Sequence, residues 1–156
     1  MRTLILYSSK YGFTEKVAKR LGEHMDNDVV LKNCTKDFSI DLTKFDNVII
    51  GSSIYVGKPS VTVLDFCESY QRLLMNKKLG FFVTGIRQEE AKGVIHENFP
   101  EDLVKHAKVK GYFGYGFDFD KMHFLDKVIT RIVVKKSESQ EKIHHLEIEK
   151  FANAFK

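Results

Sequence analysis

Three short runs of continuous apolar residues constrain the fold of this chain more than any other feature. They are TLILYS (residues 3–8), NVIIGSS (residues 47–53) and LGFFVTG (residues 79–85). Apolar runs without polar alternation are typical of strands that are covered on both faces. A weaker run, DVVLKN (residues 28–33), indicates a strand nearer an edge, and VKGYFGYGF (residues 109–117) is strand-like and rich in glycine and aromatics. The sequence therefore predicts five strands.

Amphipathic stretches separate these strands and follow the last of them. Their inward-facing residues recur at helical spacing and form five sets. The sets are Val17, Ala18, Leu21 and Met25; Val63, Phe66, Cys67, Tyr70 and Leu74; Ala91, Val94, Ile95 and Phe99; Leu125, Val128, Ile129, Ile132 and Val133; and Ile148, Phe151, Ala152 and Phe155. Strands that alternate with helices predict an α/β fold, with a parallel sheet between two helical layers. We expect one domain over residues 1–156.

Composition excludes several classes of protein. The chain is 43% hydrophobic and 29% charged, as in ordinary soluble globular proteins, and no apolar run approaches the roughly 20 residues that span a bilayer. With no signal-peptide layout, we expect a cytoplasmic protein. The net charge of +4 includes no basic run with interleaved aromatics, so we expect no nucleic-acid partner. The pair His144-His145 lacks further ligands at metal-site spacing, so we predict no metal.

The turn after the first predicted strand has the composition of a phosphate-binding loop. It reads SSKYGFT (residues 8–14) and opens the first predicted helix. Gly12 permits a close approach of a ligand, and the backbone N–H groups at a helix start suit an anion. The hydroxyls of Ser9 and Thr14 add donors, and Lys10 adds a positive charge. The alternative is an ordinary strand-to-helix turn with Thr14 as the N-cap. The chain lacks the motif GxGxxG, which argues against a dinucleotide-binding site, and it lacks GK[ST], which excludes a P-loop.

Two further loops leave the same edge of the predicted sheet. GSSIYVGK (residues 51–58) follows the second strong strand, and TGIRQEE (residues 84–90) follows the third. Tyr55 offers an aromatic ring that can stack on a flat ligand. A phosphate cradle flanked by two such loops suits a mononucleotide such as FMN.

The segment YSSKYGFTEKVAKRL (residues 7–21) resembles the phosphate loop of flavodoxins. The segment GSSIYVG (residues 51–57) is similar to the second loop of the flavodoxin-domain family that includes menaquinone-dependent protoporphyrinogen dehydrogenase. This resemblance implies a flavodoxin-like three-layer sandwich with a five-stranded parallel sheet in the order 2-1-3-4-5, and FMN as the cofactor. It assigns the FMN phosphate to Ser9, Lys10, Tyr11, Gly12, Phe13 and Thr14. We expect the flavin ring between two loops, formed by Ser52, Ser53, Ile54, Tyr55, Val56 and Gly57 and by Thr84, Gly85, Ile86 and Arg87.

Two functions fit this resemblance. One is an FMN-dependent oxidoreductase that passes electrons from a porphyrinogen-type substrate to a quinone, and the other is an electron carrier between partner proteins. The sequence identifies no catalytic residue. The three loops carry Lys10, Lys58 and Arg87 against Glu89 and Glu90, which predicts a flavin of higher potential than in acidic carriers. Basic residues at 127, 131 and 135 indicate either a solvated face or contact with an acidic partner or the anionic inner face of a membrane.

Overall fold

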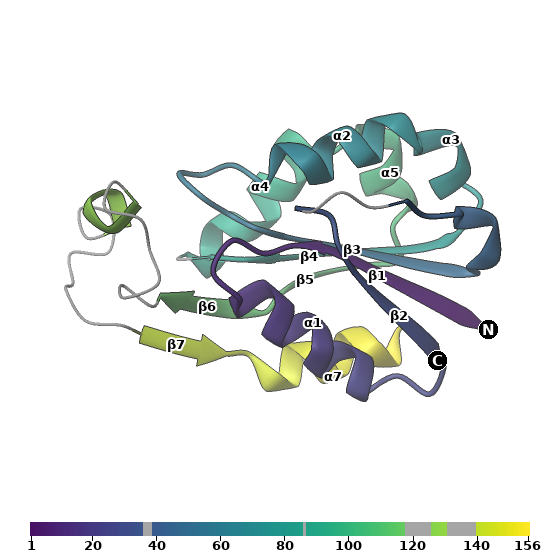
Figure 1. Cartoon of the computed structure of the whole chain (residues 1–156), viewed down its shortest axis with the longest axis horizontal. Coiled ribbons are helices and arrows are strands. Elements are labelled where there is room, and N and C mark those ends of the chain that lie inside the picture. The colour runs from purple at the N-terminus through teal and green to yellow at the C-terminus, as the bar shows by residue number, and fades with distance from the viewer. Residues whose placement is uncertain (36–38, 86, 118–125, 131–139) are drawn as a thin grey trace.

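The computed structural model describes residues 1–35, 39–85, 87–117, 126–130 and 140–156, and the structural statements below refer to these residues. Five parallel strands form the main sheet, in the order β2-β1-β3-β4-β5 (Figure 1). They are β1 (Arg2–Ser8), β2 (Asp28–Asn33), β3 (Asn47–Ser53), β4 (Lys78–Thr84) and β5 (Val109–Tyr112). The predicted strand order is confirmed. Because the strands are parallel, their carboxyl ends lie at one edge of the sheet, where the connecting loops meet.

Helices cover both faces of this sheet (Figure 1). One face carries α1 (Phe13–Glu23) and α7 (His145–Asn153). The other carries α2 (Val61–Ser69), α3 (Gln71–Leu74), α4 (Ala91–Asn98) and α5 (Glu101–His106), and the short 3-10 helices are η1 (Leu42–Lys44) and η2 (Gln88–Glu90). Among the described residues, no helix is long and apolar enough to cross a membrane.

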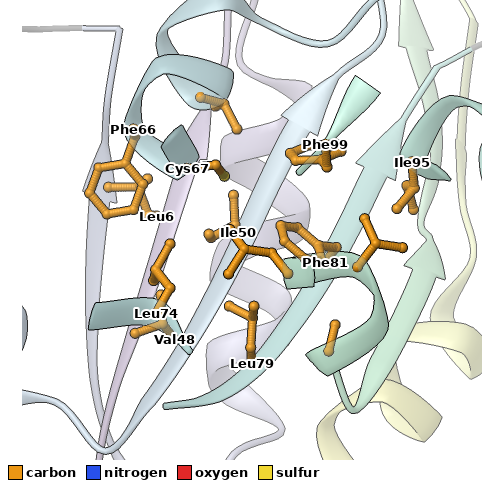
Figure 2. Close-up of a cluster of buried hydrophobic side chains, with 14 of the residues drawn as sticks. Leu6, Val48, Ile50, Phe66, Cys67, Leu74, Leu79, Phe81, Ile95 and Phe99 are labelled. Atoms are coloured by element: carbon orange, nitrogen blue, oxygen red, sulfur yellow. The ribbon is translucent and has the colours of Figure 1, made fainter. Parts of the chain in front are cut away.

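Successive side chains of β1 point to opposite faces, and the core is accordingly divided into two clusters. Leu4 and Leu6 belong to the larger cluster, which lies under α2 and α4 (Figure 2). Ile5 and Tyr7 belong to the smaller cluster, which lies under α1 and α7. Cys67 is a free thiol that lies fully buried in the larger cluster, as its place on an apolar stripe predicts. Packing on both faces fixes the strand ends from which the site loops start.

A glycine in β3 permits a close contact inside the sheet. The ring of Phe82, from the neighbouring strand β4, lies across Gly51, and a Cβ atom at Gly51 would lie 2.0 Å from the Cζ atom of that ring. The Phe82 ring also stacks on Phe113, with ring centroids 4.6 Å apart. The strand that leads into the second site loop therefore requires a residue without a side chain at this position.

In the main sheet and the helical layer from α2 to α5, the structure differs from the sequence prediction in three places. The helix predicted up to Leu74 is interrupted at Tyr70, where α2 ends and α3 begins. The sequence analysis missed α5, which has only six residues and two buried apolar side chains. The run over residues 109–117 is two strands, because β6 (Gly114–Phe117) leaves the main sheet and pairs with β7 (Gln140–Ile143).

Gly114 makes this last change of direction possible. Its φ of 106° lies in the region that glycine favours, and a Cβ atom there would lie 1.9 Å from the carbonyl oxygen of Lys142. The antiparallel pair β6–β7 extends from the carboxyl edge of the main sheet (Figure 1). It therefore brings β6 beside the loops that were predicted to form the site.

Candidate functional site

The first turn begins at the end of β1 and ends at the start of α1. Gly12 is the N-cap of α1, with φ 97°, and a Cβ atom there would meet no other atom within 4 Å. Open space therefore lies beside the helix start, and Gly12 has no side chain with which to cap the first turn. Ser9 stabilises the turn, since its Oγ atom accepts a hydrogen bond from the Gly12 N–H at 3.1 Å. The predicted alternative of Thr14 as the N-cap is wrong, because Thr14 lies inside the helix.

Thr14 instead connects the first turn to the third site loop. Its Oγ1 atom lies 2.9 Å from Oγ1 of Thr84, and both side chains are buried. Two hydroxyls that share one hydrogen bond keep further capacity to donate and accept. Both residues line a small cavity over the first turn, where an anion bound to the helix start would find hydroxyl donors.

The second loop is a tight hairpin that lies directly against the third loop. The Ile54 N–H donates to the carbonyl oxygen of Thr84 at 2.7 Å, and the backbones of Tyr55 and Lys58 exchange two hydrogen bonds, at 2.9 and 3.1 Å. The two residues between them, Val56 and Gly57, have φ values of 49° and 74°. A β-branched residue with positive φ is a strained conformation. Val56 is nevertheless exposed at the tip of this loop.

The third loop is tied to its surroundings through Gly85. The Tyr112 hydroxyl donates to the Gly85 carbonyl oxygen, and the Gly85 N–H donates to the Gly114 carbonyl oxygen at 2.9 Å. Burial raises the pKa of Tyr112 to about 12, so this phenol keeps its proton. Arg87 forms an ion pair with Glu90 at 3.1 Å. Ile86, which the sequence analysis also placed in this loop, lies outside the described residues.

Asp126 is a central residue of the site that the sequence analysis missed. Its carboxylate accepts a hydrogen bond from Tyr11, a hydrogen bond from Tyr55 at 2.5 Å and an ion pair from Lys10 at 2.5 Å. The Lys10 Nζ atom also lies 5.4 Å from the ring centroid of Tyr11 and 4.9 Å from that of Tyr55. We refer to Lys10, Tyr11, Tyr55 and Asp126 as the polar cluster. It joins the first turn, the second loop and the segment 126–130.

The polar cluster holds the Asp126 carboxylate in its ionised form. Burial alone would raise the pKa of Asp126, but hydrogen bonds from Lys10, Tyr11 and Tyr55 outweigh burial and lower it to about 2. The hydrogen bond to Asp126 also raises the pKa of Lys10, and it raises that of the Tyr55 phenol. At neutral pH the cluster is therefore a charged pair of Lys10 and Asp126, with the neutral phenol of Tyr55 and the hydroxyl of Tyr11 as hydrogen-bond donors.

The orientation of residues 126–130 corrects the predicted inward face of this segment. Val128 and Ile129 were predicted to face inward, but they are 37% and 36% exposed. Asp126 and Thr130 are buried instead. The hydrogen bonds of Asp126 explain this difference, since they turn the polar side of the segment toward the site. Lys127 is half-buried, and the other residues of the predicted helix lie outside the described residues.

Two adjoining cavities lie between these loops. A small cavity of about 80 Å³ lies over the first turn and is lined by residues that include Ser9, Thr14 and Phe117. A larger cavity of about 290 Å³ lies beside the second loop and α4, and Val94 and Ile129 are among its lining residues. Five residues border both cavities, which makes them parts of one cleft: Ile54, Tyr55, Gly85, Phe117 and Thr130.

The ion pairs change the charge balance that the sequence indicated. Asp126 adds a carboxylate beside Lys10, and Glu90 pairs with Arg87. Lys58 donates a hydrogen bond to Asn98 at 3.3 Å. Three carboxylates, Asp126, Glu89 and Glu90, then balance the three cations of the loops. Among the described residues, Asp126 therefore offsets the positive excess that the loops alone indicate, and the flavin potential inferred from that excess stays a prediction.

The fold and the site define an α/β protein with a glycine-started helix and an adjoining cleft at the carboxyl edge of a parallel sheet. A family model described as "Flavodoxin domain" matches residues 4–143, and the chain belongs to this family. No curated protein sequence matches the chain.

Solved structures share the fold. A Streptococcus pneumonia TIGR4 flavodoxin superposes with a TM-score of 0.59 at 21% identity, over 99% of this chain and 97% of that chain. Flavodoxin 2 from Bacillus cereus gives a TM-score of 0.60 at 21% identity, over 99% of this chain and 97% of that chain. A mutant Fusobacterium nucleatum flavodoxin bound to flavin mononucleotide gives 0.51 at 19% identity, over 79% of this chain and 73% of that chain.

Proposed function

We propose that this chain binds FMN and transfers electrons through it. The observation that carries the proposal is the first turn, where α1 opens at Gly12 onto free space above the hydroxyl pair of Thr14 and Thr84. Helix N–H groups, hydroxyls and one lysine are the donors that a phosphate monoester requires. Membership of the flavodoxin domain family and the FMN complex of the Fusobacterium nucleatum flavodoxin mutant support the same cofactor.

The residues present fit FMN in the following way. The turn from Ser9 to Thr14 would hold the phosphate, and the cleft between the second and third loops would hold the flavin ring. Tyr55 and Arg87 would border that ring, since both line the larger part of the cleft. Bound FMN supplies one- and two-electron redox chemistry. The protein contributes the position of the ring, the exclusion of water and the charge around it.

Electron transfer between partner proteins is the role that the charges of the site favour. Among the described residues, the carboxylate of Asp126 beside Lys10 offsets the positive excess that argued for a high-potential enzyme. The shared hydrogen bonds of the polar cluster and of Gly85 also hold the loops firmly, which favours a carrier whose cofactor must change charge without large rearrangement. We therefore propose electron transfer between partner proteins as the first of the two candidate functions.

A second candidate is an FMN-dependent oxidoreductase of the protoporphyrinogen-dehydrogenase type, with a quinone as the acceptor. The larger cavity favours it, because apolar side chains such as Ile54, Val94 and Ile129 line a space of about 290 Å³. An apolar ring system would fit such a lining. Val56 and Ile129, which line this cavity, and the neighbouring Val128 are exposed, which would also suit contact with an anionic membrane surface. Sedimentation with anionic vesicles at low salt tests that contact.

The visible spectrum of freshly purified protein tests the proposed cofactor, and a titration of the cofactor-free protein with FMN tests the site. The double variant Ser9→Ala/Thr14→Val removes two hydroxyl donors to a charged group, so FMN binding should weaken at least about 100-fold. Ser69→Ala is the matched control, since Ser69 is exposed at the end of α2. Equal FMN affinity in the double variant would place the phosphate elsewhere and overturn the proposed site.

A further inference from the structure

Two donors of the first turn are bound by a carboxylate of the same chain. The Lys10 Nζ atom lies 2.5 Å from Oδ2 of Asp126, and the Tyr11 hydroxyl donates a hydrogen bond to the same oxygen. Asp126 lies 115 residues beyond Tyr11 in the sequence. Lys10 and Tyr11 are among the residues to which the resemblance assigns the FMN phosphate. An internal anion therefore occupies donors that the phosphate would use.

The two oxygens of the Asp126 carboxylate contact different loops. Oδ2 is bound by Lys10 and Tyr11 of the first turn, whereas Oδ1 accepts a hydrogen bond from Tyr55 of the second loop at 2.5 Å. Because the contacts are divided in this way, the first turn can exchange Oδ2 for another anionic oxygen without breaking the contact of Tyr55. The link to the first turn is therefore separable from the link to the second loop.

The segment 126–130 also forms part of the wall of the cleft. Asp126 and Thr130 are buried, Thr130 borders both cavities, and Ile129 borders the larger one. The cavity over the first turn has a volume of only about 80 Å³, which is well below the usual range for small-molecule sites. Movement of this segment away from the first turn would widen that part of the cleft.

A phosphate monoester is a stronger partner for the first turn than a carboxylate is. It carries a charge of about −1.5 to −2 near neutral pH and three acceptor oxygens, whereas Asp126 offers Lys10 a single charge. Lys10 is about half exposed, and an ion pair with an exposed lysine is weak. The space beside Gly12 also places the phosphate near the N–H groups of the helix start. The exchange of Asp126 for phosphate is therefore favourable.

We propose that Asp126 is an internal competitor of the FMN phosphate. In the cofactor-free protein its Oδ2 atom occupies Lys10 and Tyr11, and the incoming phosphate displaces it from both. The segment 126–130 then leaves the first turn, while Tyr55 keeps its hydrogen bond to Oδ1. This inference rests on the proposed function, since FMN is the ligand that it invokes. It adds a regulation of that site, because binding of the cofactor is coupled to the position of the segment 126–130.

Titrations of the cofactor-free protein with FMN and with riboflavin test the competition, since riboflavin is the same flavin without the phosphate. Asp126→Asn should tighten the binding of FMN by up to about fivefold and leave that of riboflavin unchanged. An effect that acts through Tyr55 on the flavin ring would instead change both ligands equally. Glu141→Gln, which breaks the exposed ion pair of Lys16, is the matched control and should change neither.

Limited proteolysis with trypsin tests the displacement itself. Lys127 follows Asp126 directly and is half-buried, so the contacts of Asp126 with the first turn restrict access to the bond after Lys127. Saturating FMN should speed cleavage of this bond in the wild type, and riboflavin should not. In Asp126→Asn the cleavage should be fast without ligand, and FMN should change it little. Mass spectrometry of the fragments identifies the bond that is cut.

Two results would overturn the proposal. One is an Asp126→Asn variant whose gain in affinity is absent, or equal for FMN and riboflavin. The other is FMN that slows or does not change cleavage after Lys127, which would mean that the segment stays on the first turn when the cofactor is bound. If the wild type binds neither flavin, the proposed function fails separately, and inorganic phosphate becomes the probe. Faster cleavage after Lys127 in phosphate than in chloride of equal ionic strength then supports the internal competitor, and equal cleavage overturns it.

Discussion

The Lys10 Nζ atom lies 2.5 Å from Oδ2 of Asp126, although the two residues belong to opposite halves of the chain. The contact ties the segment 126–130 to the turn that opens α1. Tyr55 donates to the other oxygen of the same carboxylate, so the second loop is included as well. One carboxylate therefore connects three parts of the cleft, and it also occupies the lysine that the sequence assigned to a phosphate.

Asp126→Asn should strengthen FMN binding to the cofactor-free protein. The substitution frees Lys10 to pair with the phosphate alone and removes a negative charge near it. Because Lys10 is about half exposed, the gain should be about 0.2–1 kcal/mol, or up to about fivefold in the dissociation constant. Fluorescence titration measures it. Glu141→Gln, which breaks the exposed ion pair of Lys16, is the control. Weaker binding in Asp126→Asn would mean that the carboxylate holds the cleft closed around the cofactor.

The low pKa of Asp126 predicts a pH dependence of stability. A carboxyl whose pKa is about 2 in the folded protein and about 3.9 when unfolded stabilises the fold above the unfolded value. That contribution is lost as the pH falls from about 4 through about 2. The difference in Tm between wild type and Asp126→Asn should therefore be constant near neutral pH and shrink over this window. Differential scanning calorimetry at a series of pH values measures it, and a pH-independent difference would contradict the assignment.

The strands and the loops at their carboxyl ends could be predicted from the sequence, because continuous apolar runs and flanking glycines are local signals. Asp126 could not. Its role depends on a contact with Lys10 across most of the chain, and the helical spacing of Val128 and Ile129 pointed to the opposite orientation. Three hydrogen bonds to one buried carboxylate outweighed the burial of two apolar side chains. The sequence analysis also missed that β6 leaves the main sheet. The change of direction depends on the positive φ of Gly114, and the residue types of this aromatic-rich run do not indicate that φ.

Tyr55 provides a matched pair of variants for the flavin ring. Tyr55→Ala removes the ring, so any bound FMN should fluoresce more brightly, because a stacked tyrosine quenches flavin emission. Tyr55→Phe keeps the ring and removes only the hydrogen bond to Asp126, so its bound FMN should stay as dim as in the wild type. The quantum yield of bound FMN distinguishes the two. An unchanged yield in Tyr55→Ala would contradict stacking.

Two glycine-to-alanine substitutions should have opposite effects on stability. Gly51→Ala places a methyl group 2.0 Å from the Phe82 ring, and overpacking of this kind costs about 1–3 kcal/mol. Gly93→Ala lies on α4, where the nearest atom to the new methyl group is Oε1 of Glu97 at 4.0 Å. Alanine in a helix there should stabilise the protein by about 0.4–1 kcal/mol. Urea denaturation measures both. A neutral Gly51→Ala would show that the ring can move aside.

The redox potential of bound FMN should respond in opposite directions to the two members of the Lys10–Asp126 pair. Asp126→Asn removes a negative charge near the flavin, which favours the anionic reduced form and raises the potential. Lys10→Gln leaves Asp126 unbalanced and lowers it. One unit charge about 10 Å away, at an effective dielectric constant near 40, contributes roughly 0.8 kcal/mol, or about 35 mV for one electron. The two variants should therefore differ by about 70 mV.

A redox titration of the two variants and the wild type also separates the two candidate functions. Well-separated one-electron steps, with a very negative second step, are the behaviour of a carrier between partner proteins. A single two-electron step at higher potential would favour the oxidoreductase with a small-molecule substrate. Since the described carboxylates balance the cations of the loops, we expect the wild type to show the separated steps. Equal potentials in Asp126→Asn and Lys10→Gln would mean that the flavin ring lies too far from this pair for its charge to change the potential. The proposed position of the ring beside Tyr55 would then be wrong.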